Sequence, residues 1–160
     1  MRTNNVVEMR GSLDTIVALA ADVERWPDIL PHYRWVTLLA GGGDHKEVEM
    51  AARRGRFPVK WRAVQTIERD GATPVIRYHH IGGVTKGMDV AWTFAPNHDA
   101  VHVRIDHDFS PPWPLVGPPI ADRIIGPHFV EAIAGKTLAT IKGIVEGNDP
   151  RFDRDGRPRT

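Results

Sequence analysis

The sequence contains no cysteine, which excludes disulfides, thiolate catalysis and cysteine-ligated zinc sites. Its two serines, Ser12 and Ser110, lie outside any Gly-x-Ser-x-Gly motif, so nothing indicates a serine hydrolase. No apolar run approaches the roughly 20 residues that cross a bilayer, and the first residues lack the apolar stretch of a secretory signal. These absences predict a cytoplasmic protein without stable membrane insertion.

The charge balance is close to even, with 21 lysines and arginines against 20 acidic residues and a net charge of +1. Such a chain creates no strong field for nucleic acid, so we expect no nucleic-acid partner. The 160 residues, 41% of them hydrophobic, suit a single domain with a sizeable core. We place that domain at residues 1–147, and we expect residues 148–160, which are mostly polar, to form a disordered tail.

Two motifs suggest chemistry that their context does not support. The segment GGVTKG at 82–87 has the glycines and lysine of a phosphate loop, but it joins two strands instead of opening a helix. Eight histidines suggest a metal site, yet His79 and His80 are adjacent in a strand and cannot both face inward. A site that uses His80 with His107 stays open as an alternative, and we expect no metal and no cofactor.

Hydrophobic periodicity predicts an α+β domain. We expect a first strand over 3–10, then two short helices over 13–22 and 23–30, the first of them capped by Ser12. A period of two from Tyr33 to Phe109, interrupted by glycine-rich turns, indicates six antiparallel strands. A long helix over about 120–146 follows a proline-rich loop at 110–119. Seven strands in one curved sheet must cover their concave face, and only the last helix is long enough to do so.

Strand alternation also predicts which side chains face the interior, because the charged residues mark the outer face. Most of the inward positions are apolar, and six of them are polar: Tyr33, Arg54, Gln65, Tyr78, His80 and His107. Either backbone and water satisfy these groups, or they converge on a ligand in an apolar cavity. Gly135, in the middle of the last helix, leaves room either for a ligand or for close packing on a strand.

Four segments, in their order and spacing, resemble the START-like (Bet v 1-like, SRPBCC) superfamily and its polyketide cyclase/dehydrase branch. They are ADVERWPDILPHY (21–33), VKWRAVQ (59–65), RYHHIGGVTKGMDVAWTF (77–94) and VHVRIDHDF (101–109). The resemblance runs from about residue 4 to residue 146. It implies a helix-grip fold with a cavity between the sheet and the C-terminal helix.

The resemblance implies two functions. Coenzyme Q-binding relatives carry polyprenyl quinones or other lipids, whereas aromatase/cyclases close rings in a poly-β-ketone held on an acyl carrier protein. Tyr33 and Trp61 match the tyrosine and the tryptophan of those cyclases. Gln65 stands where they carry an arginine thought to act on the substrate carbonyl, which favours binding over catalysis. The imidazoles of His80 and His107 favour chemistry, because they can move protons near neutral pH.

The sequence therefore predicts a protein that binds a small hydrophobic ligand of polyketide, aromatic or lipid type, as a monomer or a homodimer. The alternative is a metal-independent polyketide cyclase/dehydratase, with an acyl carrier protein as partner. The catalytic candidates are Tyr33, Gln65, His80 and His107. The expected ligand-binding residues are Trp35, Arg54, Trp61, Tyr78, Trp92, Trp113 and Gly135. We expect the 82–87 turn and the 110–119 loop, which carries Trp113, to gate the entrance.

Overall fold

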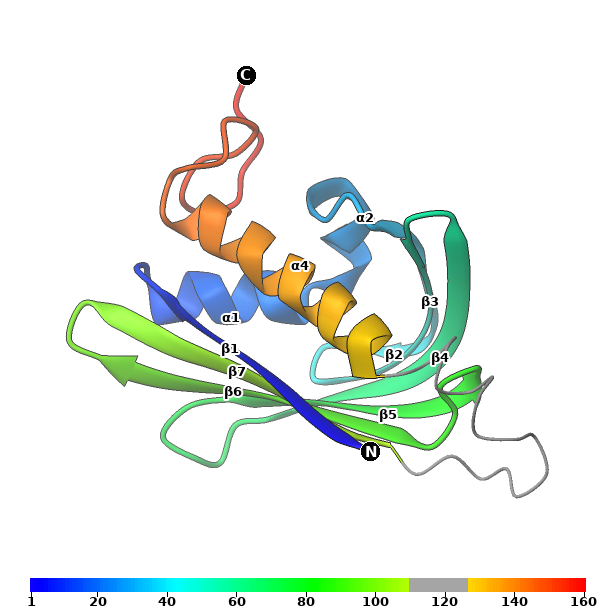
Figure 1. The fold of residues 1–160 in the computed structure, drawn as a ribbon. Coiled ribbons are helices and arrows are strands. Elements are labelled where there is room, and N and C mark those ends of the chain that lie inside the picture. Colours follow the sequence, from blue (N-terminus) through cyan, green and yellow to red (C-terminus); the bar gives the residue numbers. More distant parts are fainter. Residues whose placement is uncertain (110–126) are drawn as a thin grey trace.

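The computed structural model describes residues 1–109 and 127–160 (Figure 1). Its helices are α1 (Leu13–Ala21), the 3-10 turn η1 (Val23–Arg25), α2 (Trp26–Ile29) and α4 (Pro127–Val145). Its strands are β1 (Arg2–Met9), β2 (Tyr33–Gly42), β3 (His45–Arg54), β4 (Phe57–Glu68), β5 (Val75–Gly83), β6 (Met88–Asn97) and β7 (Ala100–Phe109).

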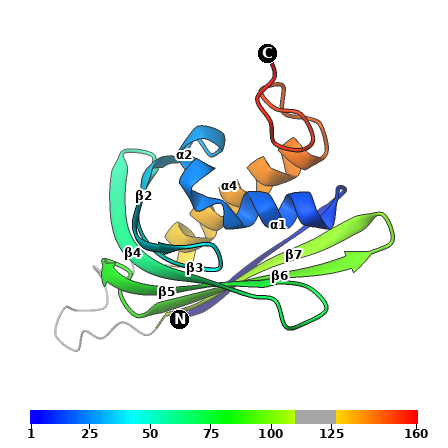
Figure 2. The same cartoon turned by 180° about the vertical axis from the view of Figure 1, so that it is seen from behind.

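All seven strands form one antiparallel sheet in the order β1-β7-β6-β5-β4-β3-β2. The sheet curves around α4, and α1 and α2 close one side of the concave face (Figures 1 and 2). This arrangement confirms the predicted α+β helix-grip fold. The alternation that carried the prediction holds on β4 to β7, where each predicted inward residue is buried.

Local sequence explains where the elements bend and begin. Ser12 caps α1, its side-chain oxygen accepting a hydrogen bond of 3.4 Å from the Thr15 amide. Gly83 ends β5 with a φ of +84°, and a Cβ at this position would collide with the Lys60 carbonyl. The chain therefore needs glycine where β5 passes close to β4 and turns toward β6.

The core lies between the concave face of the sheet and α4. Leu138, Ile141 and Ile144 form the buried stripe of that helix, which packs mainly against β1 and α1. The predicted start of this helix near residue 120 lies outside the described residues, and within them α4 begins at Pro127. No helix in the described ranges is both long and apolar enough to cross a membrane.

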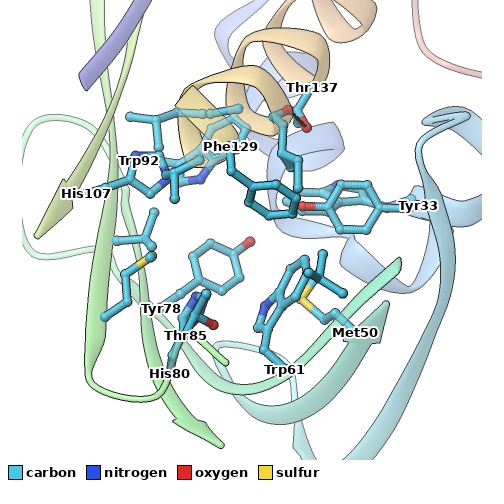
Figure 3. Close-up of a pocket in the computed structure, with 18 residues that line it drawn as sticks. Tyr33, Met50, Trp61, Tyr78, His80, Thr85, Trp92, His107, Phe129 and Thr137 are labelled. Atoms are coloured by element: carbon cyan, nitrogen blue, oxygen red, sulfur yellow. Dashed lines mark hydrogen bonds between the residues drawn. The ribbon is translucent and has the colours of Figure 1, made fainter. Parts of the chain in front are cut away.

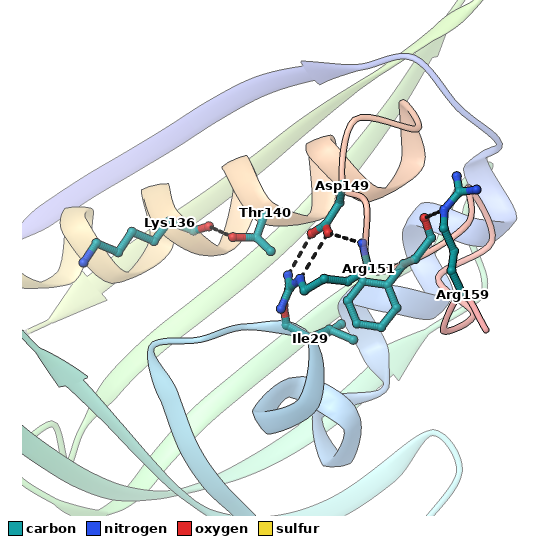
Figure 4. Close-up of polar contacts among 7 residues, drawn as sticks. Ile29, Lys136, Thr140, Asp149, Arg151 and Arg159 are labelled. Carbon is teal, nitrogen blue, oxygen red and sulfur yellow. Dashed lines mark hydrogen bonds and ion pairs between the residues drawn. The ribbon is translucent and has the colours of Figure 1, made fainter.

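Residues 148–160 form a folded segment in the structure, unlike the disordered tail expected from their composition (Figure 4). Phe152, only 6% exposed, belongs to the core. Arg151 donates a 3.1 Å hydrogen bond to the Ile29 carbonyl, and Arg25 donates one of 2.6 Å to the Gly156 carbonyl. The polar composition did not indicate this folded segment, because only one buried aromatic ring and two hydrogen bonds from arginines to carbonyls hold it in place.

Candidate functional site

A cavity of about 80 Å³ lies between α4 and the concave face of the sheet (Figure 3). Its walls come from β2 to β7, from α2 and from the first half of α4. Most of its lining is apolar or aromatic: Trp26, Tyr33, Met50, Val59, Trp61, Tyr78, Met88, Val90, Trp92, Ile105, Phe129, Val130, Ile133 and Ala134. Four polar residues complete it: His80, Thr85, His107 and Thr137.

The strand topology explains why the cavity lies toward one end of the sheet. In an antiparallel meander, alternate turns lie at the same end. The β3–β4 turn, the β5–β6 turn and the end of β7 therefore lie together. Val59, Thr85 and His107 all lie close to these chain reversals. The first turn of α4 supplies Phe129, whose ring points into the space between Trp92 and Tyr33 (Figure 3).

His80 is held by two neighbours. Its Nδ1 lies 2.6 Å from the Thr85 hydroxyl, and its ring stacks on Trp61 with centroids 5.9 Å apart and an interplanar angle of 3°. Burial, reinforced by the neighbouring His107, lowers the pKa of His80 to about 3. The ring is therefore neutral near pH 7 and is fixed in orientation.

His107 occupies the β7 wall of the cavity. Its Nδ1 is buried and has no hydrogen-bond partner among the described residues, and the same holds for the hydroxyl of Thr3, the residue opposite it on β1. Burial lowers the pKa of His107 to about 4. A ring nitrogen in this state can exchange a hydrogen bond with a ligand at little cost, because it gives up no bond within the protein.

Tyr33 and His32 approach α4 from the start of β2. The Nε2 of His32 lies 2.8 Å from the Thr137 hydroxyl, which itself donates to the Ile133 carbonyl. Burial raises the pKa of the Tyr33 phenol, and the Thr137 hydroxyl offsets part of that rise. Burial likewise raises the pKa of the Tyr78 phenol. Both phenols are therefore protonated near neutral pH.

Gln65 lies behind the cavity wall and is not part of the lining, in contrast to the direct contact expected of a catalytic residue. Its side chain is fully buried, and its Nε2 donates to the Ala21 carbonyl and to the Tyr78 hydroxyl, both at 2.9 Å. Tyr78 in turn donates to the Ala20 carbonyl at 3.3 Å. Gln65 thus ties β4 and β5 to the end of α1 and fixes the ring of Tyr78.

Three of the expected ligand-binding residues lie outside the lining. Arg54 keeps its inward parity but is exposed at the tip of the β3–β4 hairpin, beyond the end of the cavity. Trp35 is half-buried on β2, next to a register shift between Tyr33 and Trp35 that breaks simple alternation. A Cβ at Gly135 would face Asn5 on β1 at 3.6 Å.

Six of the expected site residues line the cavity: Tyr33, Trp61, Tyr78, His80, Trp92 and His107. Trp113 and the rest of the 110–119 loop lie outside the described residues. Sequence reasoning missed Thr85 and Phe129. Thr85 is in a glycine-rich turn and Phe129 is on a helix, and strand alternation applies to neither position.

Among the described residues that line the cavity, none carries a charged side chain. Its imidazoles and phenols are neutral near pH 7 for the reasons given above. In the described parts of the chain, no three histidine, aspartate or glutamate side chains are placed to hold a metal ion. Chemically, this site offers aromatic surface and a few hydrogen-bonding groups that carry no charge.

The fold and the cavity define a helix-grip protein with an internal apolar site. A family model described as polyketide cyclase/dehydrase and lipid transport matches residues 11–123, and the chain belongs to this family. A protein of Streptomyces halstedii, named as a candidate polyketide cyclase, is 24% identical over 103 residues, which are 64% of this chain and 94% of that protein.

Solved structures share the fold at low sequence identity. The Zhui aromatase/cyclase of Streptomyces sp. R1128 superimposes with a TM-score of 0.77 at 18% identity, over 89% of this chain and 92% of that one. A STAR-related lipid transfer protein of Xanthomonas axonopodis gives a TM-score of 0.67 at 16% identity, over 89% and 84% of the two chains. The neighbours thus include both a cyclase and a lipid carrier.

Proposed function

We propose that this protein binds a neutral hydrophobic molecule of polyketide, aromatic or lipid type in the cavity between α4 and the sheet. The observation that carries the proposal is the neutrality of an aromatic-lined interior. A charged ligand would lose its hydration there without gaining a counter-ion, which costs several kcal/mol. A neutral ring system would contact Trp61, Trp92 and Tyr33 and could hydrogen-bond to His107.

The ligand must enlarge the cavity as it enters. A volume of about 80 Å³ is smaller than the ~300–1,000 Å³ of typical small-molecule sites. Phe129 is the side chain placed to yield, because its ring occupies the centre of the site and comes from the first turn of α4 (Figure 3). We therefore assign Phe129 the role of a plug that the ligand displaces.

Ring closure of a polyketone is the second candidate function, and the unpartnered Nδ1 of His107 is the observation that favours it. A neutral imidazole with a lowered pKa is a weak base, so its contribution would be to position a substrate hydroxyl or carbonyl. The hydroxyl of Tyr33 would donate to a second carbonyl. Gln65 plays no direct part here, because it lies behind the lining and its Nε2 donates to Ala21 and Tyr78.

The test is identification of what the protein carries. Native mass spectrometry of the protein purified from cells, followed by solvent extraction, should reveal a neutral hydrophobic compound of defined mass. A compound bound through a carboxylate or phosphate would contradict the proposal. For the second candidate, a polyketone bound to an acyl carrier protein is incubated with and without the protein, and identical product mixtures would exclude cyclase activity on that substrate.

The proposal extends to the surroundings of the protein. We place it in the cytoplasm, the location expected from the sequence. An acyl carrier protein would be the partner only for the cyclase function.

A further inference from the structure

The most exposed large hydrophobic side chain among the described residues is Phe57, which is 74% exposed at the tip of the β3–β4 hairpin. Phe57 pairs with Arg54 across the turn, where Gly55 has a φ of +58°. An aromatic ring held in water at the end of a two-residue turn costs free energy that a partner could recover.

This tip lies beyond the end of the cavity that Val59 lines. Phe57 has the same strand parity as Val59 and Trp61, which line the cavity, so it projects from the same concave face. At about 3.3 Å per residue, the ring lies roughly 7 Å beyond Val59 along the strand. In Figure 1 the hairpin between β3 and β4 rises beside α2, at the same end as the β5–β6 turn.

Basic side chains lie on the same hairpin as Phe57 and at the same end of the sheet. Arg53, Arg54 and Arg56 are exposed on the same hairpin, and Lys86 is exposed on the β5–β6 turn at this end of the sheet. None of the four forms an ion pair with a carboxylate of the described residues. This contrasts with Arg69, Arg77 and Arg104, each of which pairs with an acidic neighbour elsewhere on the sheet.

We propose that the β3–β4 tip docks the protein onto an anionic lipid surface, with Phe57 inserted at the headgroup boundary and the arginines on the phosphates. A protruding ring flanked by basic residues is the chemistry that binds such an interface. A stable protein interface needs about 800 Å² on each partner, and a two-residue turn with one apolar ring offers far less. Docking in this position brings the end of the cavity that Val59 lines toward the membrane.

The test measures binding to vesicles of phosphatidylcholine alone and of phosphatidylcholine with about one third phosphatidylglycerol. The parent protein should bind the anionic vesicles and release them at high salt. Phe57→Ser should weaken binding about tenfold or more, since the inserted ring supplies the apolar contact. Arg54→Glu with Arg56→Glu should weaken it at least as much.

Matched controls lie far from the tip. Leu39→Ser removes a 44% exposed side chain near the β2–β3 turn, at the opposite end of the sheet, and Arg154→Glu reverses a charge on the C-terminal segment. Both should bind vesicles as the parent does. No binding to either vesicle, or equal binding by the parent and Phe57→Ser, would overturn the proposal. Binding to an acidic carrier protein without binding to vesicles would overturn it in favour of a protein partner. Vesicle binding is measured without a ligand, so its failure would leave the proposed function untouched.

Discussion

The Nε2 of Gln65 lies 2.9 Å from the hydroxyl of Tyr78 and 2.9 Å from the carbonyl of Ala21, behind the wall of the cavity. This amide holds an aromatic wall residue against the end of α1. In the helix-grip cyclases that the sequence resembles, an arginine is expected at this position. In this protein the residue at that position, Gln65, does not line the cavity but fixes Tyr78, which does.

Gln65→Leu should therefore lower the stability of the protein and leave ligand affinity nearly unchanged. The substitution leaves the partly buried Ala21 carbonyl and the buried Tyr78 hydroxyl without their donor, which costs about 1–3 kcal/mol. Urea unfolding measures the first effect and titration with a neutral fluorescent dye measures the second. A large loss of dye affinity at unchanged stability would place Gln65 in contact with the ligand.

A cavity-filling substitution on α4 should abolish ligand uptake. Ala134 lines the cavity, whereas a side chain at Gly135 would contact Asn5 on β1. Ala134→Leu should fill the site, while Gly135→Ala should bind dye normally and gain up to about 1 kcal/mol of helix stability. Dye titration and thermal unfolding of both variants check this pair. Loss of binding in Gly135→Ala alone would show that the cavity lies on the other side of the helix.

Removing the ring of Phe129 should have the opposite effect on binding. Phe129→Ala enlarges the cavity, so bulkier dyes should bind more tightly and with faster association. The truncation should also cost about 3 kcal/mol of stability, the usual range for a buried phenylalanine. Stopped-flow fluorescence against dyes of increasing size measures the rates. Unchanged rates for the bulkiest dye would remove Phe129 from its role as a plug.

Acid should destabilise the protein through its buried histidines. Folding lowers the pKa of His32 and His107 to about 4 and that of His80 to about 3, from 6.5 in the unfolded chain. Below pH 6.5 the unfolded chain binds protons that the folded chain does not bind. The free energy of unfolding is therefore highest above that pH and falls toward pH 4. At pH 5 each of these three rings lowers the free energy of unfolding by about 2 kcal/mol.

The measurement is urea unfolding at a series of pH values. His107→Gln should make the loss between pH 6.5 and 4 shallower, and His102→Gln, which changes an exposed residue on the same strand, should not. The same pH dependence in the parent and in His107→Gln would contradict the neutral state assigned to this ring.

The C-terminal segment offers a test of its packing. Phe152 is buried, and Arg151 bonds the last carbonyl of α2 (Figure 4). Phe152→Ala should cost about 3 kcal/mol, and Arg159→Ala, which loses one partly buried bond to a carbonyl, about 1 kcal/mol. Near-zero effects for both would mean that the segment is not packed in solution.

The sequence predicted the fold and most of the cavity because both rest on alternation. Tyr78, Trp92 and His107 face inward for the same reason that the neighbouring charged residues face out. The expected ligand-binding residues that do not line the cavity lie where simple alternation no longer applies or past the end of the cavity. Trp35 follows a register shift, Arg54 lies past the end of the cavity, and Gly135 is one position away from the lining residue Ala134.

Other features depend on contacts that no local pattern reveals. Thr85 reaches His80 from a turn, and Gln65 finds its partners on α1 and β5. The order of residues 148–160 depends on the Ile29 carbonyl of α2 and on Arg25 of η1, which donates to the Gly156 carbonyl, and both partners are distant in sequence. Such pairings follow from the tertiary fold.

The central claim is that a neutral hydrophobic ligand occupies the space between α4 and the sheet. Titration of the parent and of Ala134→Leu with the neutral dye N-phenyl-1-naphthylamine tests it most directly. The account predicts saturable binding to one site in the parent and none in the folded variant. Equal binding by the two proteins, or no binding by the parent, would contradict it.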